Sequence, residues 1–187
     1  MDEDDNLRIT ENRLLPQTDL ELVRKARQGD AEAFHGLVER HASYLYGLAV
    51  SLVGNTADAE DAVQETLAGA FRGLRAFREQ SSVKTWLTGI LVRQAASLFQ
   101  RGERQRAGSL GADLEAARPP KTDLRLDVNA AIVALRPDHR EVIVLRELQG
   151  LSYEEIAQAL QIPPGTVESR LFRARKELQE RLRDYLP

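Results

Sequence analysis

The sequence predicts an all-α protein made of two small helical domains joined by a flexible linker. Three observations indicate this fold. Apolar residues recur at spacings of three and four, no stretch of useful length alternates apolar and polar residues, and one internal segment is rich in Gly, Pro and charge. The chain has 187 residues, which is enough for one or two small domains with apolar cores.

The first 18 residues show no clear periodicity, and we expect a flexible acidic tail there. An acidic N-terminus differs from a signal peptide, which needs a basic and then an apolar run. No segment approaches the roughly twenty apolar residues that a membrane-spanning helix requires. The chain also lacks cysteine, so disulfides and thiolate metal sites are excluded. We therefore expect a cytoplasmic protein without direct membrane insertion.

Residues 19–106 are expected to form an N-terminal helical bundle. A short amphipathic helix, Leu20–Gln28, closes at Gly29, and Asp30 can cap the helix that follows. The next helix is expected over Asp58–Leu74 and has two distinct faces. The apolar side is predicted to point inward and consists of Ala59, Ala62, Val63, Leu67, Ala70, Phe71 and Leu74. The polar side is predicted to point outward and includes Asp61, Gln64 and Glu65.

The last helix of this bundle has a basic character. Acidic residues are absent between Val83 and Gly102. The basic residues here and just beyond are Lys84, Arg93, Arg101, Arg104 and Arg106. The apolar stripe is Val83, Trp86, Leu87, Ile90, Leu91, Gln94, Ala95, Leu98 and Phe99, so Trp86 is expected in the core. Because the whole chain has 26 Lys and Arg against 29 Asp and Glu, a nucleic-acid role has to rest on such local patches.

A linker is expected over residues 107–126, and a second domain over 127–187. That domain begins with one helix that stops at Arg136–Pro137 and another that starts at Asp138 and ends before Gly150. The stretch LSYEEIAQALQIPPGTVESRLFRARKEL follows. It predicts two short helices and a tight turn, with a capping box between Ser152 and Glu155. This pattern fits a helix-turn-helix for a DNA major groove, and also an ordinary helical hairpin whose charges are solvated.

Several segments together carry a resemblance to a known family. They are DAEDAVQETLAGAF, VKTWLTGILVRQAAS, LRPDHREVIVLRELQGLSYEEIAQAL and IPPGTVESRLFRAR. In this order and spacing the chain resembles bacterial RNA polymerase sigma factors of the extracytoplasmic-function (ECF) group of the sigma-70 family. The resemblance covers nearly the whole chain after the acidic tail. It implies that residues 19–106 are sigma region two and residues 127–187 are sigma region four.

For region two, the resemblance implies contact with the clamp coiled coil of the polymerase largest subunit and recognition and melting of the promoter −10 element. The implied polymerase contacts are Asp61, Gln64 and Glu65. The implied −10 residues are Lys84, Arg93, Ser97, Arg101 and Arg104. Two of these depart from the family pattern, since relatives often have Asn at the position of Arg93 and Asp or Asn at that of Ser97. The preferred −10 sequence is therefore expected to differ.

For region four, the resemblance implies reading of the −35 element in the major groove. The implied residues are Glu168, Ser169, Arg170, Phe172, Arg173, Arg175 and Lys176. Glu168 departs from the family pattern, because relatives often have Lys or Arg there. A carboxylate can accept a hydrogen bond from cytosine N4 but repels phosphate, so Glu168 is expected to tune sequence choice rather than to add affinity.

Nothing in the sequence supports catalysis, and the resemblance implies a factor that needs no cofactor. The three histidines, His35, His41 and His139, are far apart, and there is no Gly-rich phosphate loop. A metal site made of Asp58, Asp61 and Glu65 is the weaker interpretation of the acidic helix face, since no histidine lies near it. The implied partners are core RNA polymerase, promoter DNA and an anti-sigma factor, which the family commonly has.

Two alternatives come from other classes of protein. A conventional regulator would bind DNA alone through its helix-turn-helix, usually as a dimer on paired half-sites, but this leaves DAEDAVQE and TWLTGI unexplained. A polymerase or anti-sigma interaction module without promoter recognition is opposed by the basic residues on both expected DNA helices. Binding to duplex DNA without polymerase would favour the regulator.

Overall fold

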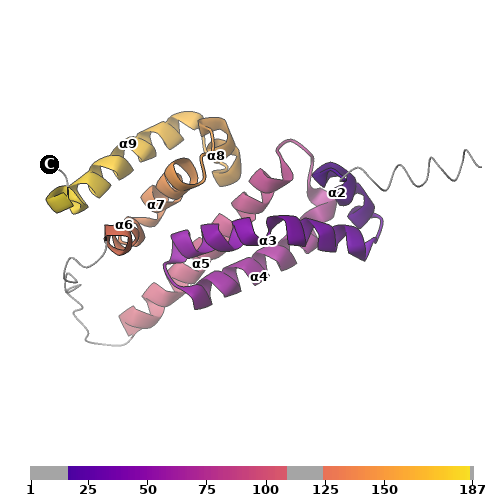
Figure 1. Ribbon diagram of the computed structural model, residues 1–187, viewed down its shortest axis with the longest axis horizontal. Coiled ribbons are helices and arrows are strands. Elements are labelled where there is room, and N and C mark those ends of the chain that lie inside the picture. Colours follow the sequence, from indigo (N-terminus) through magenta and orange to yellow (C-terminus); the bar gives the residue numbers. More distant parts are fainter. Residues whose placement is uncertain (1–16, 109–123, 186–187) are drawn as a thin grey trace, which may run out of the picture. The chain divides into compact units, whose positions relative to one another are not determined.

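The computed structural model describes residues 17–108 and 124–185, and every regular element in these residues is helical (Figure 1). The predicted all-α class is therefore confirmed. The chain divides into two compact units, Met1–Arg40 and His41–Pro187, with the division inside one continuous helix. None of the helices in the described residues is both long and apolar enough to cross a membrane.

The first compact unit contains helix α2 (Asp19–Arg27) and the beginning of α3 (Ala31–Val53). Thr18 caps α2, because its side chain accepts from the Glu21 N–H while the Glu21 carboxylate accepts from the Thr18 N–H. The predicted turn is confirmed: Gly29 has a φ of 96°, and Asp30 accepts a hydrogen bond from the Ala33 N–H at 3.1 Å.

The second compact unit continues with the rest of α3, then α4 (Thr56–Gly73), the 3-10 turn η1 (Leu74–Ala76) and α5 (Val83–Gly108). Asn55 caps α4 by accepting from the Asp58 N–H. Helix α4 packs along α5. The fully buried large side chains of these helices include Leu45, Leu48, Val83 and Leu91, which gives this part of the unit its apolar core.

One side chain of α4 lies on the opposite side from the one the sequence predicted. Phe71 is 62% exposed, although the apolar periodicity placed it in the inward stripe with Ala70 and Leu74. Ala70 and Leu74 are buried as expected. A helix turns 100° per residue, so Phe71 cannot share the inward direction with its neighbour Ala70 once Ala70 faces α5.

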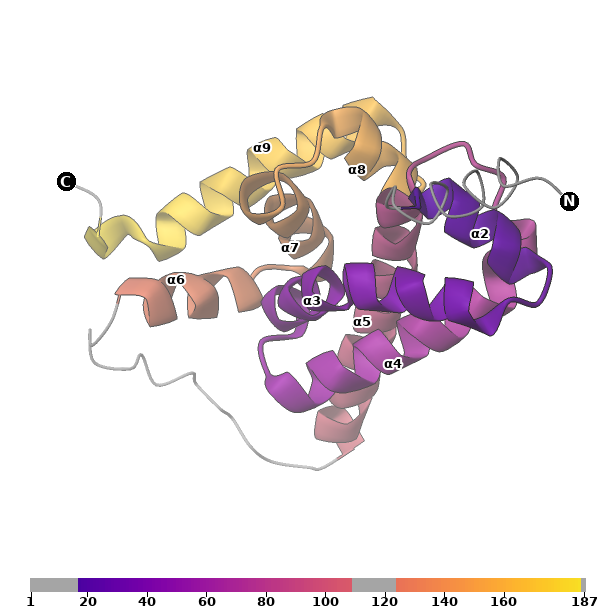
Figure 2. The same ribbon diagram turned by 45° about the vertical axis from the view of Figure 1, so that its right-hand side comes forward.

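The C-terminal helices are α6 (Leu124–Val133), α7 (Pro137–Ile143), the π-helical turn η2 (Val144–Leu148), α8 (Tyr153–Leu160), α9 (Pro164–Arg181) and the 3-10 turn η3 (Arg183–Tyr185) (Figure 2). Helix α5 extends to Gly108 and α6 begins at Leu124, inside both ends of the expected linker, whose residues 109–123 lie outside the described part of the chain. The expected boundaries of the tail, linker and two domains remain predictions.

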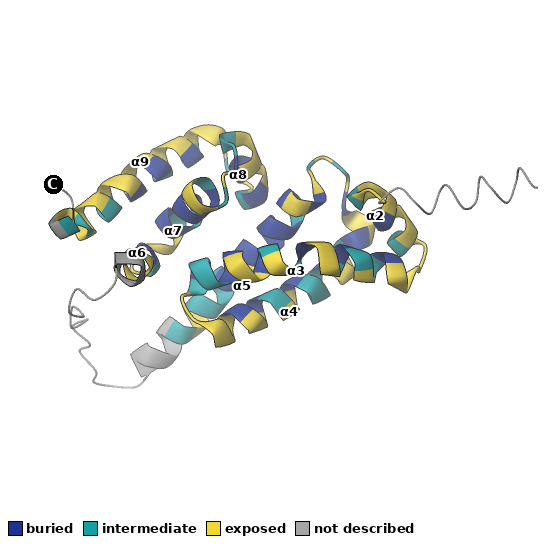
Figure 3. Ribbon diagram, in the orientation of Figure 1, coloured by how far each residue is buried: buried dark blue, intermediate teal, exposed yellow. Residues whose placement is uncertain are grey.

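Helices α8 and α9 have the local geometry of the predicted helix-turn-helix. The capping box is present, with the Glu155 N–H donating to the Ser152 hydroxyl at 3.1 Å and the Ser152 N–H donating to the Glu155 carboxylate at 2.8 Å. Gln161 ends α8 in the left-handed region with a φ of 55°. Figure 3 shows α9 with one buried and one exposed side, and the buried side comprises Val167, Leu171 and Ala174.

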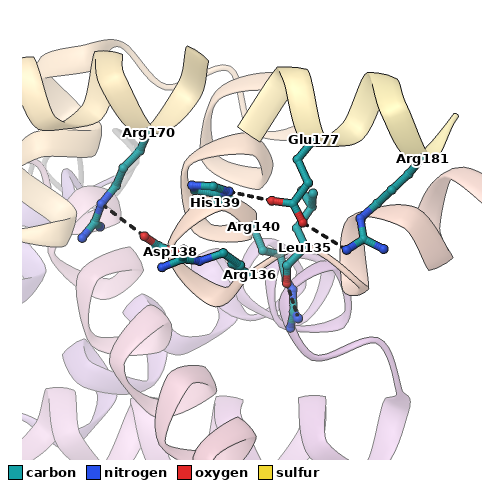
Figure 4. A network of polar contacts seen from close by, with 8 residues as sticks. All are labelled: Leu135, Arg136, Asp138, His139, Arg140, Arg170, Glu177 and Arg181. Carbon is teal, nitrogen blue, oxygen red and sulfur yellow. Dashed lines mark hydrogen bonds and ion pairs between the residues drawn. The ribbon is translucent and has the colours of Figure 1, made fainter. Parts of the chain in front are cut away.

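A polar network joins α7 to α9 (Figure 4). His139 Nδ1 lies 2.7 Å from Glu177 Oε2, and Arg181 donates to Glu177 Oε1 at 3.0 Å. Burial alone would raise the pKa of Glu177, but the hydrogen bonds from His139 and Arg181 outweigh it and lower this pKa below its usual value. His139 is therefore a buried residue whose contact with Glu177 connects α7 to α9.

Candidate nucleic-acid interface

The outward side of α9 gathers five of the residues predicted for −35 DNA. Their spacing of one, three and four residues places them on one side of the helix, and all are exposed. They are Glu168, Ser169, Phe172, Arg173 and Lys176. Phe172 is 72% exposed, more than any other large apolar residue with an exposed side chain in the described chain. An exposed aromatic ring beside cationic side chains offers both an apolar contact for a base and charge for phosphate.

The two other predicted −35 residues lie at the sides of α9 and have partners within the protein. Arg170 is half-buried, and its Nε lies 3.9 Å from Asp138 Oδ2 on α7 (Figure 4). Arg175 donates to Glu147 Oε1 from Nε at 3.1 Å and from NH2 at 2.7 Å. This hydrogen bonding to Glu147 raises the pKa of Arg175. Both arginines therefore connect α9 to neighbouring elements, Arg170 to α7 and Arg175 to η2.

On α5, the structure separates the predicted −10 residues into two groups. Arg93, Ser97 and Arg101 follow one another at intervals of four residues and so lie along one side of the helix. Lys84 points elsewhere, with its Nζ 4.2 Å from the centre of the Tyr44 ring. Arg104 lies near the end of α5, where side chains are outside the described part of the structure.

A cavity of about 460 Å³ opens beside Arg93, and the sequence reasoning missed it. Its lining comes from the loop before α5, from α5 itself and from the end of α8: Ala76, Phe77, Arg78, Gln80, Ser81, Thr85, Trp86, Gly89, Arg93, Gln158, Ala159 and Gln161. Trp86 stacks on Phe77 at a ring distance of 4.7 Å and also lines this cavity. Trp86 is partly buried. It therefore packs against its neighbours, as predicted, and also exposes part of its ring to a cavity large enough for a planar ring.

A third surface lies on α4, where Asp61, Gln64 and Glu65 are all exposed. Phe71 follows Gln64 by two helical turns and extends the same side of the helix with an apolar ring. The sequence did not predict an exposed position for Phe71, because an apolar residue among apolar neighbours is interpreted as part of the core. Asp58 instead accepts a hydrogen bond from the Asn55 amide at 2.7 Å. Among the described residues, no cluster of His, Asp or Glu side chains could hold a metal ion.

Comparison with protein families identifies two matching segments. The family described as Sigma-70 region 2 matches residues 37–105, and the family described as Sigma-70, region 4 matches residues 125–178. The first match includes the surfaces of α4 and α5, and the second includes the helix-turn-helix. Together they contain every residue that the sequence analysis assigned to polymerase or DNA.

Relatives that align with most of the chain are also sigma factors. The chain is 35% identical over 191 residues to RNA polymerase sigma-H factor of Pseudomonas aeruginosa, covering 92% of this chain and 98% of the relative. It is 38% identical over 181 residues to ECF RNA polymerase sigma-E factor of Escherichia coli K12, covering 88% and 94%. Among solved structures, the sigma factor RpoE of Bartonella quintana in complex with the anti-sigma factor NepR has a TM-score of 0.67 at 33% identity, covering 82% of this chain and 98% of that chain. CnrH in complex with the cytosolic domain of CnrY has a TM-score of 0.66 at 28% identity, covering 87% and 96%.

Proposed function

Because this chain belongs to the extracytoplasmic-function group of the sigma-70 family, it is a sigma factor that directs promoter-specific initiation, and we propose that three helix surfaces divide this work. The outward side of α4 binds core polymerase, α5 and its cavity hold the −10 element, and the outward side of α9 reads the −35 element. The observation that carries the proposal is the separation of these three exposed surfaces onto three helices inside the two family matches.

For polymerase binding, the proposed contacts are Asp61, Gln64 and Glu65, with Phe71 as the apolar anchor. Exposed carboxylates on a helix suit a partner helix with basic residues, and they fix register more than they add affinity. An aromatic side chain buried on binding supplies much of the affinity of a typical interface. The proposal is therefore an acidic recognition surface with one apolar residue at its edge.

For the −10 element, the proposed contacts are Arg93, Ser97 and Arg101, with Lys84 and Arg104 reaching phosphate. The cavity beside Arg93 has an aromatic wall formed by Trp86 and Phe77, which suits an unstacked base. Cations along one side of α5 suit the backbone of the single strand. The polar replacements at Arg93 and Ser97 make a distinct −10 preference part of the proposal.

For the −35 element, α9 presents Phe172 and Ser169 to base edges and Arg173 and Lys176 to phosphate. Arg170 and Arg175 are assigned a supporting role, since their guanidinium groups face Asp138 and Glu147. Each good base contact contributes about 1–3 kcal/mol of discrimination. Two weak sites carried by one chain on one polymerase can therefore select a promoter together.

Regulation by an anti-sigma factor belongs to the proposal. The RpoE and CnrH structures, which this chain resembles, are described as complexes with an anti-sigma factor and with the cytosolic domain of CnrY. Sigma factors are non-catalytic initiation factors, and this one is proposed to act in the cytoplasm with its polymerase. The alternatives of a lone helix-turn-helix regulator and of a bare interaction module are not favoured, because both family segments are present in one chain.

In vitro transcription tests the proposed function. Purified bacterial core polymerase is incubated with a pool of genomic fragments, with and without this protein, and the 5′ ends of the transcripts are mapped. We expect new start sites that share two spaced upstream elements. A variant with Asp61→Ala and Glu65→Ala should lose these transcripts and core binding, whereas Glu60→Ala, also exposed on α4, serves as the matched control. Protein-independent transcription, or binding to duplex DNA without core, would contradict the proposal.

A further inference from the structure

Two arginines lie on opposite flanks of the exposed side of α9, and the protein holds them in different ways. Arg175 donates two hydrogen bonds to Glu147, from Nε at 3.1 Å and from Nη2 at 2.7 Å. On the other flank, Arg170 Nε is 3.9 Å from Asp138 Oδ2 of α7 (Figure 4). A separation of 3.9 Å allows charge attraction but is too long for a hydrogen bond. Arg170 is therefore the more loosely held of the two arginines.

The other contacts of Arg170 are equally loose. Its side chain is half-buried and forms no hydrogen bond with another residue in the described part of the chain. Asp138 is shared with a second cation, because its Oδ1 lies 3.5 Å from Nε of the exposed Arg136. Glu141, three residues after Asp138 on α7, is half-buried and also attracts the Arg170 guanidinium. Two carboxylates thus attract Arg170, but neither fixes it with a hydrogen bond.

The position of Arg170 on α9 places it close to the proposed DNA surface. Arg173, which is exposed and assigned to phosphate, follows Arg170 by three residues, so the two side chains are neighbours on the helix surface. An arginine side chain is long, and its charged end can lie far from the point where its stem leaves the helix. A carboxylate and a phosphate both offer acceptor oxygens to a guanidinium. Asp138 therefore occupies Arg170 in the way that a DNA phosphate would.

We propose that Asp138 is a specificity-determining residue, which holds Arg170 until a phosphate of a matching −35 element takes its place. The inference rests on the proposed function of α9. On DNA of the wrong sequence, α9 lacks the base contacts that would fix a phosphate near Arg170, so the arginine stays with Asp138. On the −35 element, the guanidinium leaves Asp138 and binds the phosphate. Asp138 thus weakens binding to wrong sequences more than binding to the promoter.

An ordinary surface ion pair is the simpler interpretation of the same contact. Such pairs contribute little to stability, and an acidic residue in the first turn of α7, such as Asp138, also suits the helix dipole. Neither of these structural roles depends on the DNA sequence. The salt dependence of binding to matched and mismatched DNA therefore distinguishes them from the proposed role.

Salt-dependent binding of the holoenzyme tests the proposal. The full-length chain is assembled with core polymerase and titrated onto two labelled DNA fragments at several salt concentrations. One fragment carries a promoter mapped by transcription, and the other is the same promoter with its −35 element scrambled. Each phosphate contact adds about 0.9 to the slope of log K against log salt concentration. The slope therefore reports whether Arg170 contacts phosphate on each fragment.

The main variant is Asp138→Asn, which keeps the shape of the side chain and removes its charge. It should steepen the slope on the scrambled fragment by about 0.9 and leave the slope on the intact promoter unchanged, where Arg170 already contacts phosphate. Over a fourfold decrease in salt, the preference for the intact promoter should then fall about threefold relative to wild type. In a protein that carries both Asp138→Asn and Arg170→Gln, these effects should disappear, because they require the released arginine.

The reverse variant is Arg170→Gln alone. It should lower the slope on the intact promoter by about 0.9 and leave the slope on the scrambled fragment unchanged. Glu180→Gln is the matched control, since it makes the same change of charge as Asp138→Asn at an exposed position farther along α9. It should leave both slopes at their wild-type values. Thermal melts of the free proteins check that all variants are folded.

Two results would overturn the proposal. The first is an equal effect of Asp138→Asn on the two fragments, and the second is an effect that persists without Arg170, since either would indicate a general change of charge. A wild-type holoenzyme that does not prefer the intact promoter would refute the assignment of α9 to the −35 element, on which this inference rests. Comparison of the two wild-type affinities therefore separates failure of the proposed function from failure of the inference.

Discussion

Helices α5 and α9 are both assigned to promoter DNA, yet their surroundings differ. The outward side of α9 is open, with Phe172 72% exposed and Arg173 and Lys176 beside it. Helix α5 packs on α4 along one side and meets α8 along another, at Gly89. The comparison shows that α9 leaves one long side exposed, whereas α5 is covered on two sides and leaves a narrower exposed surface beside Arg93.

The largest expected effect comes from charge reversal on the open surface. Arg173→Glu removes a cation from the DNA side of α9 and adds repulsion of phosphate. We expect promoter binding by the holoenzyme to weaken by about 2–3 kcal/mol, or about thirtyfold or more. The measurement is a titration of holoenzyme on labelled promoter DNA at fixed salt. Arg183→Glu, at an exposed position in η3 just beyond α9, makes the same change of charge and is the control. Equal losses for both variants would show that the position of Arg173 on α9 does not matter.

The second prediction concerns the contacts that hold α9 against α7 and η2. His139→Ala removes the buried ring that contacts the partly buried Glu177 carboxylate, so the unfolding free energy should fall by about 2 kcal/mol. Arg175→Ala breaks an exposed pair with Glu147 and should cost less than about 1 kcal/mol. Urea denaturation followed by circular dichroism gives both values. Similar losses for the two variants would show that burial of the α7–α9 contact adds nothing.

The third prediction sharpens what the open surface reads. Glu168→Lys exchanges an acceptor for a donor at the start of α9, so preference at one −35 base pair should move from cytosine toward guanine by about 1–2 kcal/mol. Selection of promoter variants by the wild-type and mutant holoenzymes, followed by sequencing, measures this. An unchanged −35 preference would refute the role of Glu168 in sequence choice.

The smallest effect is expected at Glu141 of α7, which lines a small cleft together with Val92, Ala95 and Phe99 of α5. Burial raises the pKa of Glu141 to about 7, although Arg170 and Arg140 oppose it and Asp138 adds to it. The folded chain therefore binds more protons than the unfolded chain between about pH 4.5 and pH 7, so this group lowers stability as the pH rises through that range and the loss remains above it. Glu141→Gln should abolish this loss, adding on the order of 1 kcal/mol at pH 8 and nothing at pH 4. Thermal melts at both pH values decide the matter, and equal gains at both would exclude titration of Glu141 as the cause.

Local rules predicted most of the fold. The capping box at Ser152 and the cap at Asp30 are short-range features of the chain, and the structure has both. The helix start expected at Asp138 lies one residue after the observed start of α7 at Pro137. The buried residues of α9, Val167, Leu171 and Ala174, also follow a local spacing of three and four. These features depend on residues within one or two helical turns of each other, and for that reason a single sequence is enough to find them.

The features that the sequence did not predict depend on long-range contacts. Arg140 reaches the Leu52 carbonyl across 88 residues, and a carbonyl is present at every position, so no residue type marks the acceptor. The side of α5 that meets α8 contains the buried residues Thr85 and Gly89, which carry little apolar signal. Phe71 shows the converse error, because its apolar side chain suggested burial while the helix turn points it outward. Such surfaces become visible only when neighbouring helices are in place.

One atom of Arg140 limits how much its buried hydrogen bond to the Leu52 carbonyl can stabilise the fold. The Nε–H of Arg140 is buried and finds no acceptor among the described residues, and burial lowers the pKa of its guanidinium. A buried donor without an acceptor has a desolvation cost that the other hydrogen bonds of the same side chain must offset. The net stabilisation from the Arg140 contacts is therefore smaller than the number of its hydrogen bonds suggests.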